Sequence, residues 1–348
     1  MTHRWASSSF GIATLPLLAA MFAFGCGTSG GPKQAEGPKP DLGDHDGPGA
    51  SNGAAADGTS SPELAAANDA LAAKDFATAR KKAQAVLDKT PKNGEALFIL
   101  GNCDDADEKL DDAVVHYQGA LAADPKLTGA SVNLSADLYF LKRYDEAAEV
   151  AKAGLQYSKE TVELHLNLGY ALSGKGDHAT AAKSFANALK LKPKDPSIEI
   201  MHGNELVEAG DKAGAQAEFK NAVANAGGDL GVMRDAAIGF SHCDDPTGCV
   251  AALDQALPKS PDDKTSADIL ADRAICKHKG GDDAGWKKDL GDAIGKDSTS
   301  IKAHLALAEF SEKAKDKKTC KSEYAAVLKL QTSGPVADAA KKGLERCK

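Results

Sequence analysis

Leucine and alanine recur at helical spacing on both sides of a short polar break in the stretch Val162–Asp195. The apolar positions that share a helical face are Leu164, Leu168 and Leu172 before the break, and Ala181, Phe185, Ala188 and Leu189 after it. The break, Ser173–Asp177, contains two glycines and ends in an Asp suited to cap the next helix. The pattern predicts two short antiparallel helices with one apolar face, which a single hairpin cannot bury.

The same pattern returns with a period of 34 residues. One set of small residues comprises Ala79, Ala113, Ala147, Ala181 and Ala215, and a second set comprises Gly101, Ser135, Gly169 and Gly203. Prolines fall on the same repeat at Pro91, Pro125, Pro193 and Pro261, with Lys159 and Gly227 at the two positions between that lack one. Bulky aromatics stand at multiples of the same period, at Tyr117, Phe185 and Phe219. Small residues let paired helices approach closely, and the aromatics fill the space between hairpins. The chain is therefore expected to stack several hairpins of one kind.

These small, bulky and proline positions resemble the tetratricopeptide repeat, a 34-residue helix–turn–helix unit. The resemblance implies an all-α fold: a right-handed α-solenoid of about eight tetratricopeptide helical hairpins over residues 62–334. Residues 335–348 are expected to form a C-terminal capping helix, because the last hairpin would otherwise expose its apolar face. In the seventh hairpin the second helix, around Trp286, arrives about three residues late. We place the insertion in the turn Lys279–Asp283.

Residues 1–26 have the features of a targeting segment, with a weakly basic start and an apolar run too short to span a membrane comfortably. The run ends at Gly25-Cys26, which resembles a bacterial lipoprotein cleavage box in which Cys26 is lipidated. By that resemblance, Gly27 in place of Asp favours the outer membrane, with the protein facing the periplasm. The alternative is an ordinary signal peptide with an incidental Cys26. Residues 27–61 are rich in Gly, Ala, Pro and Asp, which predicts a disordered tether.

Charge and composition narrow the range of partners. The net charge is −8 and no basic patch stands out, which argues against a nucleic-acid partner. The chain also lacks a Gly-rich phosphate loop, an H-E-x-x-H motif and a G-x-S-x-G motif. We therefore expect no enzyme activity, no cofactor and no small-molecule substrate.

Six cysteines remain if Cys26 is acylated, and an exported chain meets an oxidising compartment. Cys249 and Cys276 are 27 residues apart, as are Cys320 and Cys347. In each pair the first cysteine takes the alanine position of a second helix, and its partner falls near the end of the following first helix. Antiparallel helices bring those ends level, so we expect two disulfides, each worth roughly 3–4 kcal/mol.

Other uses of these cysteines stay open. Cys243 and Cys249 are near enough in sequence to pair across one turn, and small buried thiols can simply replace alanine. A zinc site is a further alternative, because His242, Cys243, Cys249, Cys276 and His278 offer soft ligands, although without C-x-x-C spacing. A thiol or metal protein that uses the cysteine-rich last third is accordingly a second functional class.

The resemblance also implies a concave groove lined by the first helix of each hairpin, in which partners, mostly peptides or helices, lie. The groove-facing positions are Phe98, Asn102, Val132, Tyr139, Phe140, Leu166, Tyr170, Ile200, Asn204 and Val207. An apolar, aromatic surface of that extent is typical of an interaction site, unless several of these residues turn into the core. The groove lacks the lysines with which some family members clamp a C-terminal carboxylate.

The expected function is a membrane-anchored protein–protein interaction scaffold in the cell envelope. The alternatives within this class are a pilotin-like factor for a pilus secretin and an assembly factor for a β-barrel machine.

Overall fold

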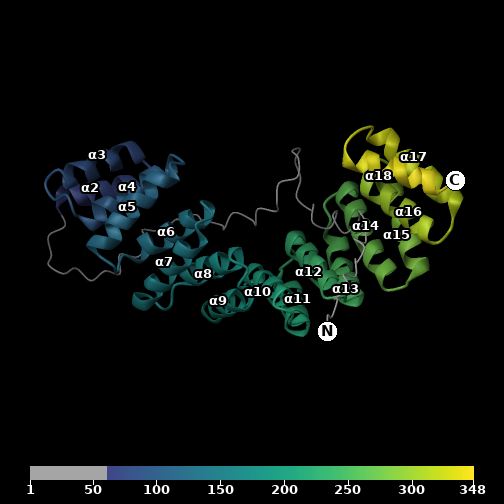
Figure 1. Ribbon diagram of the computed structural model, residues 1–348, viewed down its shortest axis with the longest axis horizontal. Coiled ribbons are helices and arrows are strands. Elements are labelled where there is room, and N and C mark those ends of the chain that lie inside the picture. Colours follow the sequence, from purple (N-terminus) through teal and green to yellow (C-terminus); the bar gives the residue numbers. More distant parts are fainter. Residues whose placement is uncertain (1–60) are drawn as a thin grey trace, which may run out of the picture. The chain divides into compact units, whose positions relative to one another are not determined.

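The computed structural model describes residues 61–348 (Figure 1). The targeting segment, Cys26 and all of the expected tether except Ser61 lie outside the described residues. Within residues 61–348 the structure contains 17 α-helices and no strand. The contacts divide the chain into two compact units, which meet between Gly248 and Cys249.

The first unit contains five complete hairpins and the first helix of a sixth. Its helices are α2 (Pro62–Ala72), α3 (Phe76–Leu87), α4 (Gly94–Ala106), α5 (Leu110–Ala123), α6 (Thr128–Phe140), α7 (Tyr144–Tyr157), α8 (Val162–Gly174), α9 (His178–Leu191), α10 (Pro196–Glu208), α11 (Lys212–Asn225) and α12 (Leu230–His242). Consecutive helices pack as antiparallel pairs, and each pair packs on the next (Figure 1).

The unit boundary passes through α13 (Pro246–Ala256), the helix that follows α12. The second unit continues with a 3₁₀ turn (Leu257–Lys259), α14 (Asp263–Lys279), α15 (Asp283–Lys296), α16 (Ile301–Lys313), α17 (Lys317–Leu330) and α18 (Pro335–Arg346). The described chain thus forms eight hairpins and a last single helix, which confirms the expected all-α solenoid with a C-terminal cap.

The 34-residue period of the sequence has a backbone counterpart in the turns within hairpins. The residue two places before each second helix takes a positive φ, and it is Lys74, Glu108, Lys142, Gly176, Gly210, Asp244, Gly281 or Lys315. In several hairpins an Asp follows this residue directly and caps the second helix, as Asp177 does by accepting a bond from the Thr180 amide. The turn therefore ends one helix and starts the next within three residues.

The spaced small residues are the places where paired helices approach most closely. Ala79, Ala113, Ala147, Ala181 and Ala215 are completely buried. A methyl group at Gly101 would lie 2.5 Å from the ring of Tyr117, and one at Gly203 would lie 2.6 Å from the ring of Phe219. Each aromatic of the second helix therefore occupies the space that a missing side chain leaves on the first.

One sequence expectation about the second unit is wrong. The turn between α14 and α15 is three residues long, as is its counterpart between α12 and α13, so it holds no insertion. Instead, α14 is 17 residues long, whereas α12 and α16 have 13. The extra residues form about one additional helical turn. A helix absorbs them more easily than the tight turn, whose glycine at 281 must keep a positive φ.

The last helix, α18, covers the apolar face of the eighth hairpin. Its buried residues are Ala337, Ala340 and Gly343. A methyl group at Gly343 would lie 2.2 Å from the Tyr324 ring, so this glycine repeats the small-on-bulky contact of the hairpins. None of the helices in the described part of the chain is long and apolar enough to cross a membrane.

Candidate protein-binding groove

The residues expected to line the groove lie on the first helices α4, α6, α8 and α10. Those that the structure leaves half-buried are Phe98, Asn102, Val132, Tyr139, Phe140, Leu166, Tyr170 and Val207, and Asn204 is exposed. The expectation that Ile200 lines the groove is wrong. Its side chain is only 8% exposed and belongs to the core, because α10 turns this position inward. We call the half-buried apolar residues Phe98, Val132, Tyr139, Phe140, Leu166, Tyr170 and Val207 the groove strip.

Tyr139 is the centre of the groove strip. Its ring lies 5.7 Å from that of Tyr170 on the next first helix, 5.8 Å from Phe140 and 5.6 Å from Tyr144. Tyr170 in turn meets the buried Phe185 edge to face at 5.4 Å. The aromatic residues of the strip therefore form a continuous series of ring contacts across two repeats. The buried sides of Tyr139 and Tyr170 pack against the hydrophobic core.

The two tyrosines are held by their surroundings. The Tyr170 hydroxyl donates to the Met201 sulfur at 3.0 Å, and burial raises the pKa of both Tyr139 and Tyr170 above the usual value. Both side chains thus stay neutral, and both are restricted before any partner arrives. A surface of this kind loses little side-chain entropy when it is covered.

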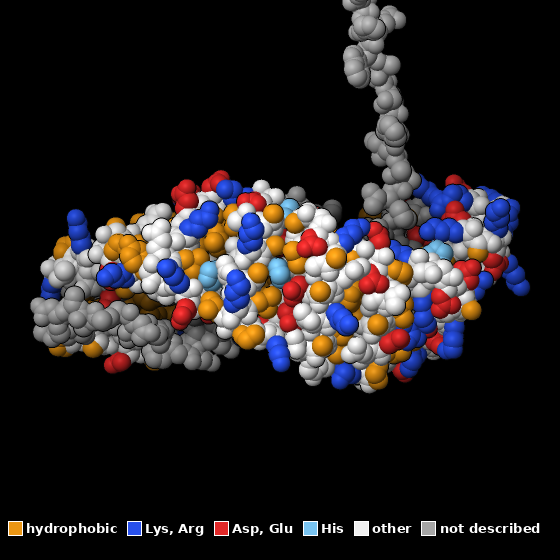
Figure 2. Space-filling view, turned by 90° about the horizontal axis from the view of Figure 1, so that it is seen from below, with side chains coloured by type: hydrophobic (Ala, Val, Ile, Leu, Met, Phe, Trp, Pro, Cys, Tyr) orange, Lys and Arg blue, Asp and Glu red, His pale blue; other side chains and the backbone are white. Residues whose placement is uncertain are grey.

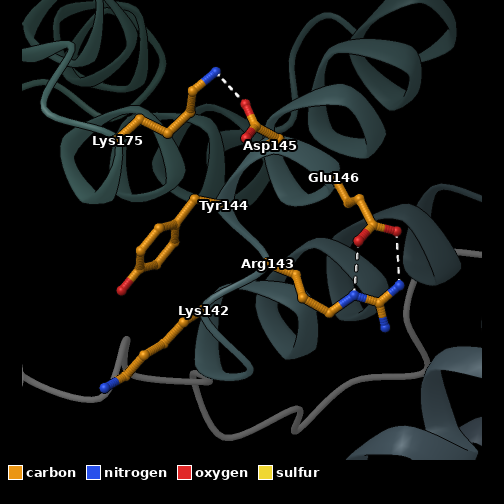
Figure 3. Close-up of a pocket in the computed structure, with 6 residues that line it drawn as sticks. All are labelled: Lys142, Arg143, Tyr144, Asp145, Glu146 and Lys175. Carbon is orange, nitrogen blue, oxygen red and sulfur yellow. Dashed lines mark hydrogen bonds and ion pairs between the residues drawn. The ribbon is translucent and has the colours of Figure 1, made fainter.

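A depression of about 400 Å³ opens where α6 turns into α7, beside Tyr144 (Figure 3). Arg143 donates to both oxygens of Glu146 at 2.8 and 2.7 Å, and Lys175 pairs with Asp145 at 2.5 Å. Figure 3 shows Lys142 and Tyr144 on the side of the depression away from these pairs. Its charged groups are mostly paired with each other, so it has the character of a polar rim next to the strip.

A polar cluster that the sequence analysis missed lies between α4, α5 and α6. Asn133 donates to Asn102 Oδ1 at 2.8 Å and to the Tyr117 hydroxyl at 3.1 Å, and the Tyr117 hydroxyl donates to Asn102 Oδ1 at 3.3 Å. One helical turn after Asn133 stands Asp137, which is only 2% exposed. The signal in the sequence was two polar residues four apart on the face that α6 packs against its neighbours.

The carboxyl group of Asp137 is unusual among these residues. Its Oδ2 atom is buried and has no hydrogen-bond partner. Burial, and to a smaller extent the negative charge of Asp105, raises the pKa of Asp137 to about 8. The group therefore carries its proton over most of the neutral range when nothing is bound.

The four cysteines of the second unit form two disulfides with each other. Cys249 is bonded to Cys276 and Cys320 to Cys347, with Cα atoms 6.0 Å apart in both pairs. Cys103 and Cys243 are free and buried, and burial raises the pKa of both thiols. The alternative pairing of Cys243 with Cys249 does not form.

Three of the five ligands proposed for zinc are committed elsewhere. Cys249 and Cys276 share a disulfide, and the His278 ring stacks on Phe310 with centroids 3.9 Å apart. In the described chain, Glu312 lies with Cys320 and Cys347 in a group of metal-ligand type, but both of these cysteines are bonded. Glu312 itself accepts hydrogen bonds from Arg346 and from Tyr324. Within residues 61–348, neither of these two groups therefore fits a metal ion.

The comparisons with known proteins agree with this geometry. The tetratricopeptide repeat family model matches residues 64–127 and 134–196. These stretches of the chain therefore contain tetratricopeptide repeats. Over 108 residues the chain is 27% identical to human Tetratricopeptide repeat protein 7B. The matched stretch covers 31% of this chain and 13% of that relative. The chain thus spans only a small part of the curated relative that it matches.

Solved structures resemble this chain at the level of the fold. The C-terminal part of a TPR repeat-containing protein from Cytophaga hutchinsonii is 14% identical, with a TM-score of 0.57 over 71% of this chain and 99% of that one. PilF of Pseudomonas aeruginosa is 18% identical, with a TM-score of 0.48 over 60% of this chain and 95% of that one. Proteins of this family are generally non-enzymatic scaffolds that bind peptides or proteins in the groove. The repeats therefore support a protein–protein interaction scaffold.

Proposed function

We propose that this protein binds an extended or helical segment of another protein along α4, α6, α8 and α10, with the groove strip as its apolar floor. The contact between Tyr139 and Tyr170 supports this most directly, because it joins two repeats into one surface. Rings that are half-buried and already restricted combine a large contact area with a polar tip, as binding hot spots do.

The charge distribution supports a specific partner rather than general adhesion. On the face seen in Figure 2, hydrophobic side chains are dispersed among acidic and basic ones. A surface of mixed sign resists unspecific association, so a continuous strip inside a groove becomes the preferred apolar contact.

We also propose that the protein is exported and held by a lipid on Cys26 at the outer membrane, facing the periplasm. The apolar run ending in Gly25-Cys26 supports the anchor, and the composition of residues 27–61 supports a tether that holds the repeats away from the bilayer. Two disulfides in residues 249–348 support an oxidising compartment. A pilotin-like or β-barrel assembly role would be a particular form of this scaffold.

The experiment is crosslinking in cells followed by capture of the full-length protein, compared with a variant carrying Tyr139→Ala and Tyr170→Ala. A Tyr157→Ala variant is the matched control, because this tyrosine is 53% exposed and lies on a second helix. A partner captured by wild type and control but not by the groove variant would support the proposal. Recovery of a secretin or a β-barrel assembly subunit would assign the narrower role, and equal capture by all three proteins would contradict groove binding.

A further inference from the structure

Two ion pairs neutralise most of the charge around the depression where α6 turns into α7. Arg143 donates to both oxygens of Glu146 at 2.8 and 2.7 Å, and Lys175 pairs with Asp145 at 2.5 Å. These contacts use both of the carboxylates that line the depression. Lys142 is the third cation in its wall, and within residues 61–348 its ammonium group has no hydrogen-bond or ion-pair partner. The depression therefore keeps one positive charge that the described chain does not balance.

Tyr144 places a second donor beside this charge. Its ring lies 5.6 Å from that of Tyr139 on α6, and a methyl group at Gly174, the last residue of α8, would lie 2.8 Å from it. The ring is thus held between two repeats, yet among the described residues its hydroxyl has no hydrogen-bond partner. Figure 3 shows this hydroxyl and the Lys142 ammonium group reaching to the same side, away from both ion pairs. The two donors can therefore serve one ligand.

The groove strip leads to this depression. Phe140 of the strip is the last residue of α6, and Lys142 follows it by two residues. Tyr139, at the centre of the strip, contacts Tyr144 in the wall of the depression. A segment that covered Tyr139 and Phe140 would therefore bring its next polar side chain to the two donors.

We propose that Lys142 and Tyr144 bind the carboxylate of an acidic side chain, Asp or Glu, of the protein segment that lies on the groove strip. A carboxylate accepts a charge-assisted hydrogen bond from the ammonium group and a second bond from the phenol, which matches the two donors. A phosphoryl group fits less well, because it carries roughly two negative charges and the other cations of the depression are already paired. This inference rests on the proposed function, since it names a side chain of the segment that the groove binds.

The position of this site matters because its surroundings are negative. Residues 61–248 contain 29 Asp and Glu against 20 Lys and Arg. Asp111, near the start of α5, also acts on Arg143 from outside the depression. Away from Lys142, an acidic residue of the segment meets a unit of net negative charge, whereas at Lys142 it is attracted. The depression therefore fixes where along the first helices the segment lies.

The test uses random peptides displayed on phage through their C-termini, selected on the full-length protein and screened against the Tyr139→Ala/Tyr170→Ala variant. Peptides that bind only the wild type are groove-dependent, and we expect them to share an Asp or Glu. As synthetic peptides with an amidated C-terminus, they should bind the wild type about fivefold more weakly once that acid is replaced by its amide, as expected for one partly exposed charged contact. The same replacement should cost little in Lys142→Met, which removes the charge but keeps an unbranched side chain. In Tyr144→Phe it should cost less than in the wild type.

A matched control is Lys152→Met, which removes an exposed ammonium group from α7, about two turns beyond Tyr144. In this control the amide replacement should weaken binding as much as in the wild type. Groove-dependent peptides that share no acid, or an acid whose replacement costs the same in the wild type and in Lys142→Met, would overturn the carboxylate site and leave the proposed function intact. The absence of any groove-dependent peptide would overturn both.

Discussion

Gly169 on α8 lies directly against the ring of Phe185 on α9, so that a methyl group at Gly169 would be 2.7 Å from the ring. The pair shows how one hairpin of the array holds together. The aromatic side chain of the second helix fills the gap left by the glycine of the first, and the same relation recurs at Gly101 with Tyr117 and at Gly203 with Phe219. The Phe185 ring also contacts the Tyr170 ring edge to face, which links the hairpin core to the groove.

The first prediction concerns this pair. Phe185→Ala should destabilise the protein by roughly 3–5 kcal/mol, because it removes a fully buried ring and leaves a cavity between two helices. Urea unfolding followed by circular dichroism measures the change. Tyr157→Ala, at an exposed aromatic, should shift the midpoint only slightly. Similar midpoints for Phe185→Ala and the wild type would contradict the packing described here.

The second prediction concerns the disulfides. Peptide mapping of the oxidised protein should find Cys249 linked to Cys276 and Cys320 linked to Cys347, with Cys103 and Cys243 alkylated only after unfolding. Cys320→Ser with Cys347→Ser should loosen α18, with a loss on the order of 3 kcal/mol from chain entropy, and amide exchange in residues 335–346 should speed up. A peptide joining Cys243 to Cys249 would contradict this pairing.

The third prediction follows from the buried Asp137. Its pKa is raised from 3.8 to about 8, so the folded protein binds more protons than the unfolded chain between those values. The free energy of unfolding should therefore fall as the pH rises from about 4 to 8, by at most ~1.4 kcal/mol per pH unit for this one group. Asp137→Asn should remove that slope and be more stable than the wild type near pH 8. Parallel stability curves for the two proteins would contradict the assignment.

Other ionisable groups lie near Asp137 or have shifted pKa values of their own. Asp105 on α4 raises its pKa through charge, and Tyr117 on α5 is influenced by both carboxyls. Glu309 in the second unit also has a raised pKa, of about 7, mainly through burial. Its contribution is common to the wild type and to Asp137→Asn, so the difference between their curves isolates Asp137.

The fourth prediction concerns the proposed anchor. Cys26→Ala should leave an unprocessed precursor that takes up no labelled fatty acid, because the variant lacks the Cys26 thiol to which the lipid would be attached. Labelling of cells with a fatty-acid analogue, followed by gel analysis, measures this directly. Unchanged labelling in Cys26→Ala would rule out the lipid anchor and remove the support for the proposed location.

The sequence predicted the hairpins because their spacing depends on local residue types. Small residues at fixed positions, glycines in tight turns and Asp caps are each visible without a structure. The extra turn of α14 was misplaced because inserted residues can lengthen either a helix or a turn, and the spacing of the apolar positions alone does not distinguish the two. Ile200 was assigned to the groove because a small change in helix orientation turns such a position inward.

The polar contacts of the site depend on tertiary structure and were much harder to foresee. Asn133 and Asp137 look like ordinary polar positions of a helix until α4 and α5 supply Asn102 and Tyr117. In the second unit, Asp289 is almost completely buried and is held by Arg273 at 2.7 Å and by Lys277 at 2.8 Å, a pairing that joins α14 to α15. Such networks have no fixed sequence spacing, so periodicity does not reveal them.

The measurement that tests the central claim most directly is the affinity of a captured partner segment for the wild type and for the Tyr139→Ala/Tyr170→Ala variant, by titration calorimetry, with unfolding curves of both proteins. The account predicts that the variant loses on the order of 2 kcal/mol or more of binding free energy, while it loses less stability than Phe185→Ala. Unchanged affinity in the variant would show that the binding surface lies elsewhere. A loss of stability as large as that of Phe185→Ala would show that the groove strip is core.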